Sequence, residues 1–114
     1  MKYIDLHADT ILQVLQQGED SSLYDNTHTH IDLKRLQAGN SLAQCFAVWL
    51  PDSDFEMMDV DARFSPTTYE EDLQYIDLAV DRLKKEIKQH SEIISWAKNS
   101  ADIRKNEAAG KISA

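Results

Sequence analysis

Three side chains that could bind a metal or transfer protons stand at alternate positions near the start of the chain: Asp5, His7 and Asp9. They alternate with apolar Ile4 and Leu6, which is the period of a β-strand, so the three project to one face about 6.6 Å apart. An imidazole and a carboxylate on adjacent same-side positions can bind one metal ion, and zinc accepts both donors. His7 and Asp9 are therefore candidate metal ligands, and further ligands would have to come from elsewhere.

A second interpretation of the same residues needs no metal. Residues 10–17, TILQVLQQ, predict a helix that Gly18 ends and that follows the strand directly. Asp9 could cap the first turn of this helix with its carboxylate. The junction is nevertheless the carboxyl end of a strand, where barrel enzymes carry their catalytic groups. Both interpretations remain open from the sequence.

The remaining histidines and the cysteine are weaker candidates. His28 and His30 lie in a polar, turn-rich segment, where we expect them to be solvated rather than metal-bound. His90 falls at the end of the predicted long helix, where a structural role is expected. Cys45 lies within the apolar run 41–50 and has no neighbouring base in the sequence, so we expect a buried small side chain and not a nucleophile.

The middle of the chain predicts a short helix followed by a second strand. Asp32 heads a short helical segment that closes at Gly39. Residues 41–50 form a nearly continuous apolar run before Pro51, as expected for a strand covered on both faces of a parallel sheet. Residues 52–64 are acidic and lack a period, which predicts a loop excursion.

A long helix over 69–87 is predicted next. Thr68 with Glu71 fits a capping box at its start. Its apolar stripe consists of Tyr69, Leu73, Ile76, Val80, Leu83 and Ile87. A shorter helix over 100–110 and the opening of another strand at 111–114 follow. Strands that alternate with helices predict an α/β fold with a parallel sheet.

Composition limits the partners and the compartment. The chain has 114 residues, 12 Lys and Arg against 20 Asp and Glu, and a net charge of −8. This acidic balance argues against nucleic acid and against an anionic membrane as partners. No apolar run is long enough for a membrane span, and no secretory signal is evident at the N-terminus. A single cysteine fits a reducing compartment, so we expect a cytoplasmic protein.

The number of predicted strands is small for a parallel sheet. Two strands and the start of a third would leave strand edges and apolar faces open. We therefore expect that the sequence is a fragment, or that another copy of the chain covers the gap.

Four sequence blocks, spread along the whole chain and in the same order, resemble the renal (membrane) dipeptidase family of zinc dipeptidases. They are DLHAD at 5–9, HIDLKRL at 30–36, QCFAVWLP at 44–51, and a last block made of SADIR at 100–104 with GKI at 110–112. Each block is modest alone, and their order gives the resemblance its weight.

The resemblance implies a hydrolase with a TIM-type (β/α)8 barrel and two zinc ions at the carboxyl ends of its strands. His7 and Asp9 match the family's ligands of one zinc, while Asp5 would at most orient a ligand. The histidine that matches His30 is not a ligand in the family. The bridging glutamate and the histidines of the second zinc would come after Ala114.

The resemblance therefore implies zinc-dependent hydrolysis of dipeptides by a metal-activated water. Residues 1–114 would be the N-terminal part of a single metallo-dipeptidase barrel domain, about its first two to three βα units, and inactive alone. The remainder of the barrel or another copy would cover the open strand edges.

Two other functions remain open. One is a different barrel metallohydrolase, acting on a cyclic amide or a phosphoester. The other is a non-enzymatic acidic interaction module that pairs through helix 69–87 and loses its association on Leu83→Asp.

Overall fold

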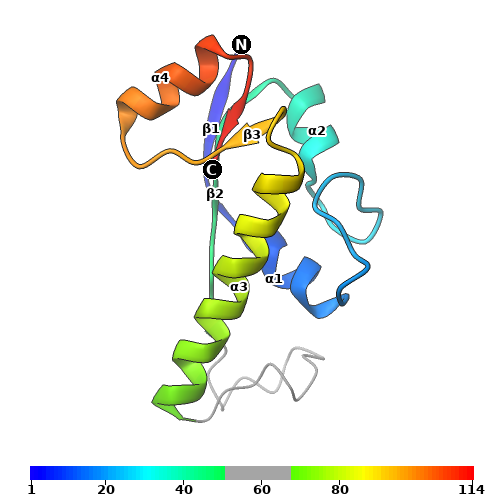
Figure 1. Ribbon diagram of the computed structural model, residues 1–114. Helices are drawn as coiled ribbons and strands as arrows, with labels where there is room; N and C mark the ends of the chain where they lie inside the picture. The colour runs from blue at the N-terminus through cyan, green and yellow to red at the C-terminus, as the bar shows by residue number, and fades with distance from the viewer. Residues whose placement is uncertain (51–67) are drawn as a thin grey trace.

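The computed structural model describes residues 1–50 and 68–114 and has a mixed α/β architecture (Figure 1). In chain order its elements are β1 (Tyr3–Ala8), α1 (Thr10–Gln16), α2 (Leu33–Ala38), β2 (Ser41–Phe46), α3 (Tyr69–Gln89), β3 (Ile94–Ser95), α4 (Ser100–Ala108) and β4 (Ile112–Ser113). The strands form one sheet in the order β1-β2-β4-β3, and every neighbouring pair is parallel. The predicted α/β class with a parallel sheet is confirmed. The predicted loop excursion at 52–64 lies outside the described residues.

Strand β3 was not predicted from the sequence. The expectation of two strands and the start of a third is wrong for the described residues, because Ile94–Ser95 pairs with β4. The amide of Ile112 donates to the carbonyl of Ile93 over 2.8 Å, and the amide of Ala114 donates to the carbonyl of Ser95 over 2.9 Å. A segment of two residues is too short to show the alternation of polar and apolar residues that predicts a strand, so only its pairing with β4 identifies β3.

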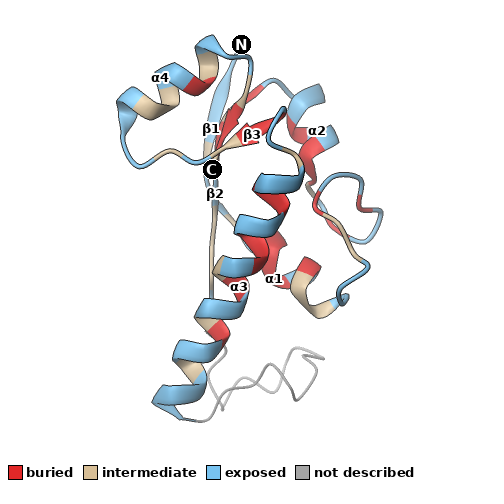
Figure 2. Cartoon of the chain, in the orientation of Figure 1, coloured by how far each residue is buried: buried red, intermediate tan, exposed pale blue. Residues whose placement is uncertain are grey.

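The hydrophobic core lies between the sheet and the helices, with α1 packed against α3. Ile11 and Val14 of α1 are fully buried. Helix α1 ends where Gly18 adopts a φ of +97°, a conformation that favours glycine. Figure 2 shows that the buried residues of α3 are concentrated in the part of the helix nearer its carboxyl end.

The buried face of α3 differs from the predicted apolar stripe. Leu83 and Ile87 are buried as expected, but Tyr69 and Leu73 at the start of the helix are exposed. Two charged residues, Arg82 and Glu86, are buried in addition. The capping box of Thr68 and Glu71 at the start of α3 is confirmed, with both of its hydrogen bonds at 3.2 Å.

The buried pair Arg82 and Glu86 attaches the segment that follows α1 to helix α3. Nε of Arg82 donates to Oε1 of Glu86 over 3.0 Å, and both side chains are almost fully buried. Nη1 of Arg82 donates to the carbonyl of Gly18, and Oε2 of Glu86 accepts from the amide of Leu23 over 2.9 Å. These bonds satisfy both charges, as buried ions require, and they hold the chain just after α1.

Strand β1 lies at the edge of the sheet and is poorly covered. Leu6 is 78% exposed and Ile4 is 48% exposed, and Figure 2 shows most of β1 in the colour of exposed residues. The prediction that Cys45 is buried is wrong, because its side chain on β2 is exposed. The physical reason is that the described residues leave this part of the sheet without a covering layer.

Candidate metal centre

His7 and Asp9 face each other at the carboxyl end of β1. His7 is the second-last residue of β1, and Asp9, just after the strand, is the N-cap residue of α1. Nε2 of His7 lies 3.3 Å from each of the two carboxylate oxygens of Asp9. The two side chains are 67% and 54% exposed. The pair is therefore open to solvent and to a small solute.

The separation of these donor atoms suits one tetrahedral metal ion. A tetrahedral zinc ion with bonds of about 2.1 Å places two of its ligand atoms about 3.4 Å apart. The observed 3.3 Å between Nε2 of His7 and the oxygens of Asp9 is close to this separation. Without a metal, the same distance is a hydrogen-bonding contact between the imidazole and the carboxylate, longer than most charge-assisted hydrogen bonds, which measure about 2.7–2.9 Å. The donor types and their spacing thus fit zinc, as part of a larger ligand set.

The alternative that Asp9 caps helix α1 through its carboxylate is wrong. Asp9 occupies the N-cap position, but its side chain makes no capping hydrogen bond. Its carbonyl accepts from the amide of Leu12 over 3.1 Å, which starts the helix, while its carboxylate turns to His7. The carboxylate is consequently free of a structural task in the helix.

Asp5 contacts the backbone of His7 and does not contact its ring. Oδ1 of Asp5 accepts a hydrogen bond from the amide of His7 over 3.0 Å. The pairing of β1 with β2 is irregular at this point: Asp5 pairs with Gln44 and Ala8 pairs with Phe46, so β1 has one extra residue. Such a bulge bends a strand and redirects its side chains. Nothing in the sequence indicates this bulge.

The other histidines do not join the pair. His28 and His30 are exposed in the segment between α1 and α2, as predicted. His90 follows α3, stacks on the ring of Tyr24 at 5.1 Å and lies 3.8 Å from Glu86, in keeping with a structural role. Within residues 1–50 and 68–114, no group of three or more His, Cys, Asp or Glu side chains could hold a metal ion.

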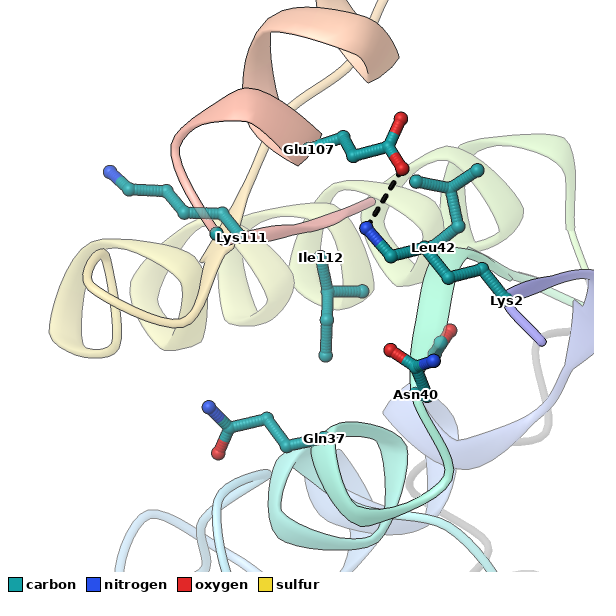
Figure 3. A pocket seen from close by; sticks show the side chains of 9 residues that line it. Lys2, Gln37, Asn40, Leu42, Glu107, Lys111 and Ile112 are labelled. Atoms are coloured by element: carbon teal, nitrogen blue, oxygen red, sulfur yellow. Dashed lines mark hydrogen bonds and ion pairs between the residues drawn. The ribbon is translucent and has the colours of Figure 1, made fainter.

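A separate pocket of about 240 Å³ lies at the other end of the sheet (Figure 3). Lys2, Ser41 and Ile112, which line it, stand at the amino ends of β1, β2 and β4. Lys2 already forms an ion pair of 2.8 Å with Glu107 across the pocket. This pocket is not part of the His7–Asp9 site.

Parallel strands that lead into helices, with polar donors at the carboxyl end of a strand, are the architecture of α/β enzymes. The chain belongs to the membrane dipeptidase family, peptidase family M19, whose sequence model matches residues 1–114. The resemblance found in the sequence is confirmed, and the chain is related to peptide hydrolases. Among curated proteins, none matches the chain. No helix in the part of the chain that the structure describes is long and apolar enough to cross a membrane.

Proposed function

We propose that this chain supplies the first metal-binding residues of a zinc-dependent dipeptidase, with His7 and Asp9 as ligands of one zinc ion. The observation that carries the proposal is the distance of 3.3 Å from Nε2 of His7 to both oxygens of Asp9. Membership of a dipeptidase family supports the same activity. The exposure of both side chains supports it further, because a metal and a dipeptide must reach them.

The residues of the chain would act by binding and orientation. His7 offers the lone pair of Nε2, which requires a neutral imidazole with its proton on Nδ1. Asp9 offers a carboxylate oxygen that lowers the net charge of the site. Zinc bound there would polarise a peptide carbonyl and lower the pKa of a bound water. The main chain holds both ligands, because His7 lies at the end of β1 and Asp9 begins α1.

The proposal includes a complete site with two zinc ions and further ligands from outside the described residues. Two donors alone make an incomplete zinc site, since catalytic zinc takes three protein ligands. The part β1-β2-β4 of the observed strand order is compatible with the first three strands of a (β/α)8 barrel, whereas β3, which pairs with the far edge of β4, departs from the sequential order of such a barrel. Further strands, from the remainder of a barrel or from another copy, would pair with the open edge of β1. We expect no dipeptide turnover by residues 1–114 alone.

The two alternatives differ in what they predict. A different barrel metallohydrolase would bind metal at the same pair but hydrolyse a cyclic amide or a phosphoester. An acidic interaction module would pair through helix α3 and ignore zinc. Leu83 is only 7% exposed and belongs to the core, so Leu83→Asp would unfold the chain rather than test pairing. Leu78, which is 53% exposed on α3, is the suitable position for that test.

Isothermal titration of the chain with zinc tests the proposed function. Because two donors alone make an incomplete zinc site, we expect residues 1–114 to bind zinc weakly, and we expect this weak binding to be lost in His7→Ala and in Asp9→Ala. His30→Ala is the matched control, because His30 is exposed but lies away from the strand end, and it should bind as the parent does. Unchanged binding in both variants of the pair would exclude these residues as ligands.

A cytoplasmic location also remains a proposal, which fractionation of the producing cell would test.

A further inference from the structure

We propose that Asp5 is a positioning residue that fixes the metal-binding conformation of His7 through the His7 amide. This inference rests on the proposed function, because it concerns how the His7–Asp9 pair is held. The hydrogen bond of 3.0 Å from the His7 amide to Oδ1 of Asp5 is its main observation.

The position of this bond in the sheet explains why it matters. Strand β1 gains one residue relative to β2 between Asp5 and Ala8, and His7 lies inside this bulge. A bulge interrupts the regular ladder, so its backbone conformation needs another constraint. The carboxylate of Asp5 supplies that constraint two residues along the chain, as aspartate side chains commonly do for a nearby amide.

Regular pairing resumes directly after the bulge. The amide of Ala47 in the segment after β2 donates to the carbonyl of Ala8 over 2.8 Å. His7 is thus held on one side by the Asp5 carboxylate and on the other by the pairing of Ala8. Strand β1 is an edge strand, and the His7 side chain is 67% exposed. Loss of the Asp5 bond should therefore widen the range of conformations of the imidazole relative to Asp9.

The chain allows the hydrogen bond to be separated from the charge. Asp5→Asn removes the negative charge but keeps a side-chain oxygen that can accept the His7 amide. Asp5→Ala removes both. If Asp5 acts through its negative charge, both variants should lose zinc affinity. If Asp5 acts through this hydrogen bond, only Asp5→Ala should lose zinc affinity.

The first measurement needs no metal. Amide hydrogen exchange of His7, followed by NMR, should become about tenfold faster in Asp5→Ala, because local opening costs less free energy there. It should stay within about threefold in Asp5→Asn, where the acceptor is retained. Asp77→Ala, at an exposed aspartate of α3, is the matched control. Unchanged exchange of the core amide of Ile94 would show that each variant is folded.

The second measurement is zinc affinity by titration calorimetry. The dissociation constant should rise about 10- to 100-fold in Asp5→Ala, the usual effect of removing a group that orients a ligand. Asp5→Asn should restore it to within about threefold of the parent, since the acceptor oxygen remains. Slow exchange of the His7 amide in Asp5→Ala, or equal loss of affinity in both variants, would overturn the positioning role.

These results can be told apart from a failure of the proposed function. If the parent chain shows not even weak zinc binding through His7 and Asp9, the function proposed for the pair is wrong, and the positioning role of Asp5 is overturned with it. If the parent binds zinc and Asp5→Ala binds equally well, the function stands and the positioning role is overturned.

Discussion

Both carboxylate oxygens of Asp9 lie 3.3 Å from Nε2 of His7, although Asp9 occupies the position of a helix cap. An aspartate at an N-cap normally accepts a hydrogen bond from the first turn of the helix, worth about 1 kcal/mol. Asp9 leaves that bond unmade and turns to a histidine instead. The neighbouring helices keep theirs: Asp32 caps α2 and Thr68 caps α3 with side-chain hydrogen bonds. Helix α1 therefore lacks the stabilising side-chain cap at Asp9, the residue that is proposed as a metal ligand.

Removal of Glu86 should destabilise the fold strongly. Glu86→Ala leaves the buried guanidinium of Arg82 without its carboxylate, which costs about 3–5 kcal/mol of unfolding free energy. Denaturant unfolding measures the change. The matched control is Asp81→Ala in the exposed pair with Lys84, which should cost less than about 1 kcal/mol. Equal effects of the two substitutions would contradict the role given to the buried pair.

The side chain of Gln44 on β2 is almost fully buried. Its Oε1 is buried and has no hydrogen-bond partner among the described residues, while its Nε2 donates to the carbonyl of Cys45 over 3.2 Å. Gln44→Met removes the unmatched acceptor at similar size, so the free energy of unfolding should rise by about 1 kcal/mol. Gln37→Met, at an exposed position, should have little effect. A clear loss of stability in Gln44→Met would show that Oε1 has a partner in solution.

Tyr75 should make the fold sensitive to alkali. Burial raises the pKa of Tyr75, and a hydrogen bond with Gln16 partly offsets this shift. The folded chain therefore binds the phenolic proton more tightly than the unfolded chain. Its contribution to stability is complete below pH of about 10 and is lost as the pH rises through the folded pKa. Unfolding free energies measured across this range should fall less steeply in Tyr75→Phe, and parallel curves for both chains would argue against this assignment.

The open edge at β1 should cause association. Leu6 is 78% exposed on an edge strand, and exposed apolar edge strands pair with other chains. Leu6→Lys should reduce the mass seen by light scattering at high protein concentration, with stability changed by less than about 0.5 kcal/mol. Leu78→Lys on α3 is the control and tests the alternative of pairing through that helix. Dissociation by Leu78→Lys alone would favour the helix as the interface.

Much of the fold could be predicted from local signals in the sequence. The alternation of polar and apolar residues predicts β1. The N-cap residues Asp32 and Thr68 predict where α2 and α3 begin, and Gly18 predicts where α1 ends. These signals can be read from the sequence because each depends on residues only a few positions apart. What could not be predicted depends on distant contacts. Strand β3 exists only through its pairing with β4, and Glu86 is buried only because its partners come from the segment after α1.

The candidate site was predictable in its residue types but not in its geometry. The pattern of Asp5, His7 and Asp9 indicated possible ligands, and it indicated a helix cap equally well. The structure excludes the cap, because the Asp9 side chain makes no capping hydrogen bond, while the ligand role stays a prediction. The bulge near His7 could not be predicted, because it depends on how β1 pairs with β2. The exposure of Cys45 was missed for a related reason, since an apolar run predicts cover that the described residues do not provide.

X-ray absorption at the zinc edge, on the chain loaded with zinc, tests the central claim most directly. The account predicts an imidazole nitrogen at about 2.0 Å in the shell of the metal, with oxygen ligands at about 2.0–2.2 Å. The imidazole contribution should disappear in His7→Ala and persist in His30→Ala. An imidazole signal that survives in His7→Ala would mean that zinc binds elsewhere and that His7 and Asp9 do not hold it together.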